Sequence, residues 1–233
     1  MTDSMRVSVI IPVHNGDRYL AAAIESVLAQ THAAFEIIVV NDGSTDASAD
    51  VARRTSDKVR VLSQNQSGAA TARNHGIREA KGDILAFLDA DDLWSTTKLQ
   101  CQLEALQNEP SLDGVYTMID HFVSPELTED RKRRILCPDK PLPAPIATTI
   151  CVRSASFHRI GFFRPDLRVG EFVDWFARAM EHPLHFFMIP QVMAHRRLHD
   201  RNIGVTDRSS RADFARIIKA SLDRRREKGE LIP

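Results

Sequence analysis

The chain has 233 residues, of which 43% are hydrophobic, so it is long enough to bury one sizeable core. Lysine plus arginine and aspartate plus glutamate number 31 each, which argues against a general nucleic-acid binder. No stretch approaches the roughly 18 apolar residues of a membrane span, and the first residues show no signal-peptide pattern. Three dispersed cysteines, Cys101, Cys137 and Cys151, are typical of reduced thiols, and we therefore expect a cytoplasmic protein.

Strands and helices alternate through the first half of the chain. Apolar runs predict strands over residues 7–13, 35–40, 59–62 and 84–88. Apolar residues at helical spacing predict a first helix that Asp17 caps and that runs to residue 28. A second helix, capped by Ser44, Thr45 or Asp46, continues through residue 52, and a third covers residues 69–80. This alternation is typical of βαβ units around a parallel sheet, so we expect an α/β fold.

The fourth of these strands runs directly into three acids, Asp89, Asp91 and Asp92. Ligands of open α/β sheets bind at the carboxyl ends of the strands, where these acids emerge. Unpaired neighbouring carboxylates repel one another, so we expect a divalent cation, Mg²⁺ or Mn²⁺, shared with the phosphates of a substrate. The alternative is a solvated acidic turn that caps the next helix.

The second half of the chain is less regular. We predict strands over residues 115–123, 146–152 and 185–189, and helices over residues 97–106, 154–159 and 171–180. The segment 124–145 contains an Arg-Lys-Arg-Arg run and several prolines, which predicts an exposed excursion. Its charge run is either a solvated face, or a lid or contact for an anionic acceptor or membrane surface.

Residues 209–228 are predicted to form a last helix. Phe214, Ile217, Ile218 and Leu222 make an apolar stripe against a strongly basic face. The stripe either packs on the rest of the domain or allows peripheral contact with a membrane.

Four motifs, in this order and spacing, resemble the family 2 inverting glycosyltransferases of the GT-A fold. They are residues 7–15 (VSVIIPVHN), 37–46 (IIVVNDGSTD), 68–76 (GAATARNHG) and 86–92 (AFLDADD). The resemblance is dense across residues 7–102 and looser through 161–163, 170–171 and 197–199. It implies a single domain over residues 1–233, with an open, Rossmann-like, mostly parallel sheet flanked by helices. In that domain, residues 1–107 would bind the nucleotide-sugar, 108–206 would form the acceptor and catalytic half, and 207–233 a basic amphipathic helix.

The resemblance also assigns binding roles in the first half of the chain. Pro12, Val13 and Asn15 would line the pocket for the base and ribose of a nucleotide-sugar, usually UDP-linked. Asp42 would accept a hydrogen bond from the N–H of the base. Arg73 would approach the base or the diphosphate, since a guanidinium suits either.

The acidic motif and a later motif would hold the sugar, the cation and the diphosphate. Asp89 and Ala90 would lie near the ribose or sugar, and Asp91 would be the direct ligand of Mn²⁺ or Mg²⁺. Asp92 would bind the metal or orient the sugar. In the later motif, Arg197 would support the leaving diphosphate and His199 would join the metal or the diphosphate; the alternative for His199 is a structural histidine.

The catalytic base is where this sequence departs from the family pattern. Relatives commonly have Gly-Glu-Asp before the late amphipathic helix, with the Asp as base, whereas here Phe172 occupies that position. Glu171 is the first candidate because it adjoins the missing acid. Asp174 is the second, with the alternative that it caps the helix or pairs with Arg178.

The resemblance implies a metal-dependent inverting glycosyltransferase that moves a sugar from a nucleotide-sugar to an unknown hydroxyl acceptor. The acceptor could be a glycan, a lipid-linked sugar, a peptide or a small molecule. Phe172 keeps a second interpretation open, a nucleotide-sugar-binding module with weak or no transfer. A nucleotidyltransferase is a third, although residues 13–16 lack the basic cluster that its phosphate loop would need.

Overall fold

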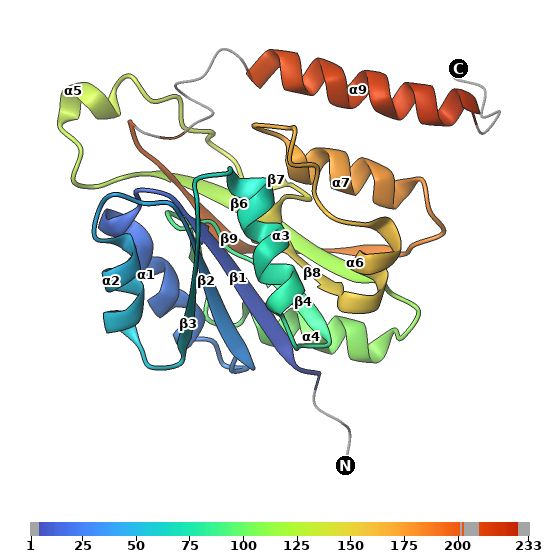
Figure 1. The fold of residues 1–233 in the computed structure, drawn as a ribbon, viewed down its shortest axis with the longest axis horizontal. Helices are drawn as coiled ribbons and strands as arrows, with labels where there is room; N and C mark the ends of the chain where they lie inside the picture. Colours follow the sequence, from blue (N-terminus) through green and yellow to red (C-terminus); the bar gives the residue numbers. More distant parts are fainter. Residues whose placement is uncertain (1–4, 201, 203–209, 228–233) are drawn as a thin grey trace.

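The computed structural model describes residues 5–200, 202 and 210–227, and its strands form one curled sheet (Figure 1). The sheet has the strand order β3-β2-β1-β4-β8-β6-β9-β5, and β7 pairs with β6 off this path. The strands are β1 (Val7–Val13), β2 (Glu36–Asp42), β3 (Val59–Gln64), β4 (Ile84–Phe87), β5 (Leu93–Trp94), β6 (Gly114–Val123), β7 (Leu142–Pro143), β8 (Ile150–Arg153) and β9 (Phe186–Leu198). By their pairings, β1, β2, β3, β4, β6 and β9 run in one direction and β5, β7 and β8 in the other. The sheet is therefore mostly parallel, as predicted.

Helices cover both faces of this sheet. They are α1 (Asp17–Leu28), α2 (Ser48–Thr55), α3 (Ala69–Glu79), α4 (Lys98–Asn108), α5 (Glu129–Lys132), α6 (Ser154–Ile160), α7 (Glu171–Met180) and α9 (Ser210–Glu227), with a 3-10 turn at Ala147–Thr149. On one face α1, α2 and α4 pack against β1, β2 and β4. On the other, α3, α6 and α7 form an aromatic-rich core. The predicted α/β architecture is confirmed.

Helix starts differ from their predicted caps by a few residues. Gly16, not Asp17, is the N-cap of α1, and Asp17 is its first helical residue. Asp46 lies two residues before α2, where its carboxylate accepts the N–H of Ser48 at 2.9 Å. Both acids still lie at the N-terminus of a helix, where helix electrostatics favours a negative charge.

Two predicted strands of the second half have different bounds. The predicted strand over residues 146–152 is divided, because Thr149 Oγ1 donates to the Ala144 carbonyl at 2.6 Å and tightens a 3-10 turn before β8. The predicted strand over residues 185–189 is only the start of β9, which continues to Leu198 beside β6. The short strand β5 was not predicted; it pairs with β9 across a long sequence separation.

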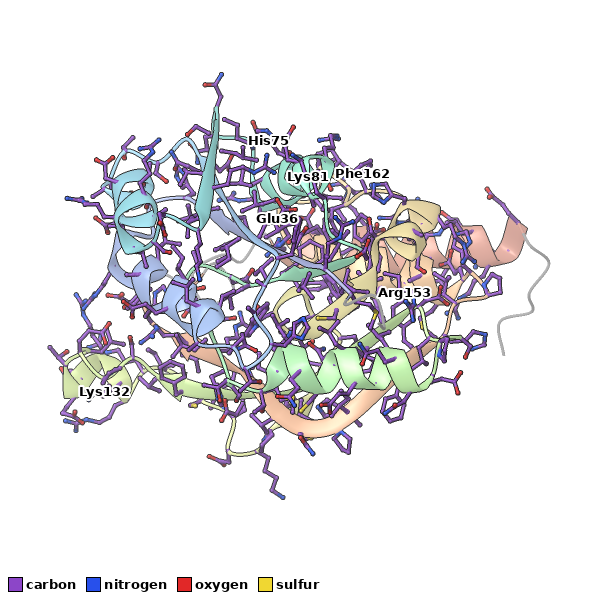
Figure 2. All side chains as sticks on the ribbon, turned by 90° about the horizontal axis from the view of Figure 1, so that it is seen from below. Glu36, His75, Lys81, Lys132, Arg153 and Phe162 are labelled. Atoms are coloured by element: carbon purple, nitrogen blue, oxygen red, sulfur yellow. The ribbon has the colours of Figure 1, made fainter. Side chains whose placement is uncertain are left out.

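The segment 124–145 contains the short helix α5 and strand β7. Lys132 of α5 lies at the edge of the molecule (Figure 2). Leu136 is 94% exposed. The predicted exposed excursion is therefore confirmed. Within the described residues, no helix combines the length and the apolar character needed to cross a bilayer.

Candidate active site

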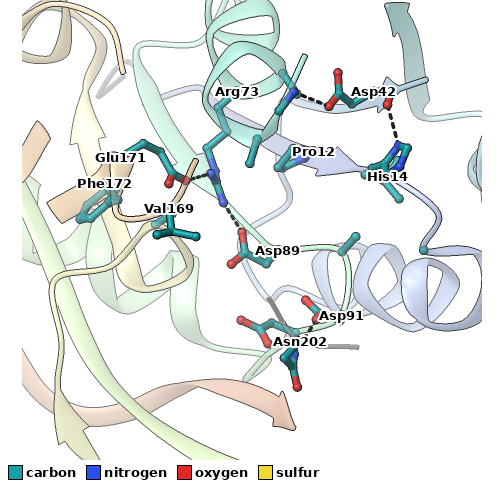
Figure 3. A pocket seen from close by; sticks show the side chains of 18 of the residues that line it. Pro12, His14, Asp42, Arg73, Asp89, Asp91, Val169, Glu171, Phe172 and Asn202 are labelled. Carbon is teal, nitrogen blue, oxygen red and sulfur yellow. Dashed lines mark hydrogen bonds and ion pairs between the residues drawn. The ribbon is translucent and has the colours of Figure 1, made fainter. Parts of the chain in front are cut away.

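A cavity of ≈ 740 Å³ opens at the carboxyl ends of β1, β2 and β4 (Figure 3). The last residues of β1 and β2 and the residues after β4 line it together. Predicted binding residues on its wall are Pro12, Val13, Asn15, Asp42, Arg73, Asp89, Ala90, Asp91, Asp92, Glu171 and His199. Arg197 and Asp174 are not among the lining residues.

Asp42 is held rigidly on one side of the cavity. Its Oδ1 accepts the amide of Gln64 and the N–H of Ser67, and its Oδ2 accepts the N–H of Gly68, each at 2.8 Å. A carboxylate oxygen has more than one lone pair, so Oδ2 can still accept a ligand donor. The loop geometry thus fixes the direction in which Asp42 presents that oxygen.

Asn15 ties two of the lining loops together. It has a backbone φ of 51°, in the left-handed region that asparagine tolerates better than most residues. Its side-chain oxygen accepts the N–H of Thr45 at 2.8 Å, and its own N–H donates to Ser44 at 3.0 Å. The adjacent His14 also lines the cavity.

Arg73 connects two carboxylates across the cavity (Figure 3). The guanidinium is buried, with Nη1 bonded to Glu171 and Nη2 bonded to Asp89. Burial alone would lower the pKa of Arg73, but Asp89 and Glu171 raise it above its ordinary value. The side chain predicted to approach the base or diphosphate is therefore engaged as a charged clamp between α3, β4 and α7.

Glu171 is the acid that α7 presents to the cavity. Its side chain is 12% exposed, and Oε1 pairs with Arg73. Oε2 makes no hydrogen bond to any described residue, so it remains available to a substrate proton. Phe172, in the position of the usual family acid, packs against Phe163 and Trp175, with ring centroids 6.1 and 5.6 Å apart.

Asp174 points into the protein instead. It is completely buried, and Oδ2 accepts from Arg178 Nε at 2.9 Å while Oδ1 lies 3.7 Å from Arg164 Nη1. The alternative that Asp174 pairs with Arg178 is confirmed. A carboxylate held this way cannot reach a substrate in the cavity, which leaves Glu171 as the acid of α7 that can.

Asp91 forms a polar cluster with the end of β9. Its Oδ2 lies 2.9 Å from His199 Nε2 and 3.1 Å from the amide nitrogen of Asn202 (Figure 3). The backbone N–H of His199 donates to Asn202 Oδ1 at 2.5 Å. Asn202 was not predicted; the only sequence signal was its place three residues after His199.

Asp92 faces the protein rather than the cavity centre. Oδ1 accepts the N–H of Arg197 at 3.0 Å and Oδ2 accepts the Thr148 hydroxyl at 3.1 Å. Burial, and then the charges of Asp91 and Asp89, raise the pKa of Asp92 well above its ordinary value. Its main contacts therefore anchor β9 to the acidic loop.

Arg197 also has a different environment from the one predicted. Its Nε donates to the Asp91 carbonyl at 3.0 Å, and its guanidinium lies 4.7 Å from the ring centroids of both Tyr19 and Phe122. The Tyr19 ring in turn lies 4.8 Å from that of His199 and lines the cavity. Arg197 thus supports the acidic loop from behind, while its neighbour Arg196 lines the cavity.

Helix α9 fixes the segment that precedes α7. Asp213 Oδ2 accepts the N–H groups of Arg168 at 3.0 Å and Val169 at 3.3 Å. Gly170 has a φ of 77°, and a Cβ added there would lie 2.9 Å from Ile217 Cδ1. This close approach explains why glycine is required before α7, and it makes α9 part of the wall of the site.

The profile of the family described as Glycosyl transferase family 2 matches residues 8–168. This chain belongs to glycosyltransferase family 2. It is 33% identical over 211 residues to an uncharacterised glycosyltransferase of Rickettsia typhi, covering 85% of this chain and 66% of the relative. It is 42% identical over 147 residues to one from a Nostoc species, covering 57% and 46%. The chain therefore spans between about half and two thirds of these relatives.

Solved structures show the same fold at low sequence identity. Residues 1–349 of TarS from S. aureus, in complex with UDP-GlcNAc, align with a TM-score of 0.74 and 19% identity, covering 93% of this chain and 65% of that one. The mannosyltransferase PcManGT from Pyrobaculum calidifontis, in complex with GDP-Man and Mn²⁺, gives 0.71 and 19%, covering 94% and 65%. The expected family and GT-A fold are confirmed.

Proposed function

We propose that this family 2 chain is a divalent-metal-dependent inverting glycosyltransferase that uses a nucleotide-sugar donor, in the first instance UDP-linked, and a hydroxyl acceptor. The observation that carries the proposal is the convergence of Asp42, Asp91 and Glu171 on one cavity from three separate elements. These positions suit a base, a diphosphate and an acceptor in turn. The donors in the TarS and PcManGT complexes support the same class of ligand.

The side chains around Asp91 fit a cation shared with a substrate. Within the described part of the chain, no group of three or more His, Cys, Asp or Glu side chains could hold a metal alone. Mg²⁺ and Mn²⁺, however, commonly take one or two protein ligands and complete their shell with phosphate oxygens and water. Asp91 Oδ2 and His199 Nε2, 2.9 Å apart, would supply those two ligands. When bound, the cation would neutralise the charge of the leaving diphosphate.

Glu171 is proposed as the catalytic base. Inverting transfer is a single displacement in which a base takes the proton of the acceptor hydroxyl while the diphosphate leaves from the opposite face. Glu171 Oε2 would accept that proton, while Arg73 holds Oε1 and so fixes the direction of the carboxylate. The same clamp positions Asp89, which we propose contacts the donor's ribose or sugar.

A nucleotide-sugar-binding module without transfer is the second candidate, because the usual base position holds Phe172 in the aromatic core. A measurement of turnover distinguishes this binding module from the glycosyltransferase proposed above. The nucleotidyltransferase alternative has lost support, since the matching profile and relatives are glycosyltransferases.

The test is a panel of nucleotide-sugars with Mn²⁺, measured by calorimetry and by release of the nucleoside diphosphate. We expect saturable binding of at least one donor, slow hydrolysis, and loss of both with EDTA. Asp91→Asn should lower turnover by at least about 100-fold, since ligands to a catalytic cation matter at least as much as the residues that orient them. Asp50→Asn, at an exposed acid of α2, is the matched control and should behave as the unmodified protein.

Binding that is indifferent to EDTA and to Asp91→Asn would refute the metal-dependent mechanism. Metal-dependent binding with no release of diphosphate for any donor or acceptor would favour the binding module.

A further inference from the structure

Helix α7 buries an aromatic side in the core, and its outer side is apolar as well. Its charged residues Asp174 and Arg178 face inward, with exposed side-chain fractions of 0% and 17%, and pair with each other. Its apolar residues Val173 and Met180 face outward and are 41% and 56% exposed. The outer side of a surface helix in a water-soluble protein is normally polar or charged. An apolar outer face next to an active site indicates a surface that something else covers.

Helix α9 extends this apolar surface. It lies beside α7, and Arg224 of α9 forms a bidentate ion pair with Glu181 at the end of α7 (Figure 1). Ile217 packs inward, but Phe214 and Ile218 are 42% and 61% exposed. The predicted apolar stripe of this helix is therefore only partly used for packing on the domain.

We call Val173, Met180, Phe214 and Ile218 the α7–α9 strip. Residues seven apart on α7 and four apart on α9 lie on one side of each helix, so each pair faces one direction. Val173 and Phe214 also line the active-site cavity. The strip thus begins at the mouth of the cavity and continues outward along both helices.

The strip is accompanied by positive charge. The 18 residues of α9 include six Lys or Arg and three Asp or Glu. Two of the cations, Arg216 and Arg224, are paired with acids of the domain. Lys219, Arg225 and Arg226 are exposed, and Arg226 lies 3.9 Å from Asp223 of the same helix. Apolar side chains flanked by exposed cations are the combination that favours the interface of an anionic bilayer.

We propose that the α7–α9 strip docks on an anionic lipid bilayer and holds the mouth of the cavity at the membrane surface. The apolar side chains would enter the boundary between headgroups and acyl chains, and the cations would contact anionic headgroups. A second copy of the chain fits less well, because a two-fold interface would place the same cations opposite one another. That the acceptor hydroxyl then belongs to a bilayer-borne molecule rests on the proposed function.

Flotation with vesicles tests the proposal without any donor or acceptor. The full chain should float with phosphatidylcholine vesicles that contain phosphatidylglycerol, much less with pure phosphatidylcholine, and less as salt is added. The double variant Phe214→Ser, Ile218→Ser should reduce the bound fraction at least about tenfold, because two large apolar side chains no longer enter the bilayer. Phe35→Ser, at a 49% exposed phenylalanine outside the strip, is the matched control and should float normally.

Absence of flotation with anionic vesicles, or equal losses in the double variant and in Phe35→Ser, would overturn the proposal. So would a dimer in light scattering that the double variant dissociates, since the strip would then bind a second copy. Thermal melts show that each variant is folded. Asp91→Asn should float like the unmodified protein, so a failure of the proposed transferase function leaves the flotation result intact.

Discussion

The two sides of the cavity are built in different ways. On the proposed donor side, Asp42 ends β2 and Asp91 follows β4, and Asp42 is held by backbone N–H groups of the loop after β3. On the opposite side, Glu171 begins a helix whose position depends on buried ion pairs and on α9. The donor side therefore depends on local backbone, and the acceptor side on side-chain contacts between elements far apart in sequence.

This difference teaches where mutations should affect chemistry and where they should affect stability. Glu171 and Asp174 are both buried, although only Glu171 lines the cavity, so burial alone does not identify a catalytic group. Orientation does: Glu171 faces the cavity, and Asp174, three residues later, faces the protein.

The largest expected effect is on turnover. Glu171→Gln should lower kcat between about 10²- and 10⁴-fold, because the amide cannot accept the acceptor proton, while donor affinity stays close to normal. Rates and calorimetry with the donor found in the panel measure both. Glu181→Gln, at a buried acid paired with Arg224 outside the cavity, is the control and should retain kcat. Equal kcat in Glu171→Gln and the unmodified protein would remove Glu171 as base.

Substitution of Asp174 should affect stability and leave turnover nearly unchanged. Asp174→Asn should lower the free energy of unfolding by about 3 kcal/mol, because it leaves the partly buried Arg178 without its charged partner. Turnover per folded molecule should be nearly unchanged. Urea unfolding and rates at low temperature separate the two effects. A large loss of kcat at normal stability would instead place Asp174 in the chemistry.

A smaller effect is expected at the contact between α9 and the segment before α7. Asp213→Ala should lower the free energy of unfolding by about 2 kcal/mol, because two backbone N–H groups lose a charged acceptor. Hydrogen exchange at Arg168 and Val169 should become faster. Asp223→Ala, at a half-exposed acid of the same helix, should change neither. Unchanged exchange in Asp213→Ala would show that α9 does not hold this segment.

The smallest effect is a pH dependence in the first half. Lys98 is fully buried beside Trp94 and Gln102, and burial lowers the pKa of Lys98 to about 8. The unfolded chain then binds more protons between about pH 8 and 10.5, so the Lys98 contribution to stability rises with pH across that window. The free energy of unfolding of Lys98→Met, relative to that of the unmodified protein, should therefore fall by about 1 to 2 kcal/mol between pH 7 and 10.

Urea unfolding at several pH values measures this difference between the two proteins. A difference that is independent of pH would show that Lys98 keeps an ordinary pKa. Such a result would also remove the contrast between buried Lys98, which forms no ion pair among the described residues, and buried Asp174, which pairs with Arg178.

Much of the donor side was determined by the sequence alone. Apolar runs of four to seven residues and turn residues at their ends predicted β1, β2, β3 and β4, and parallel strands bring such ends to one edge. The meeting of Asp42 with the acids after β4 follows from that rule. The exact starts of α1 and α2 did not follow, because several polar residues in one turn can cap equally well.

Only the tertiary structure determined the side of the cavity that Glu171 and α7 form. Sequence placed Glu171 and Asp174 on one helix, but their directions depend on whether Arg73 or Arg178 is the nearer cation, and Arg73 lies 98 residues before Glu171. The pairing of β5 with β9, the place of Asn202 beside Asp91 and the contact of α9 with Gly170 also join distant segments. Local patterns carry no record of such contacts, because long-range packing chooses among side-chain directions that are locally equivalent.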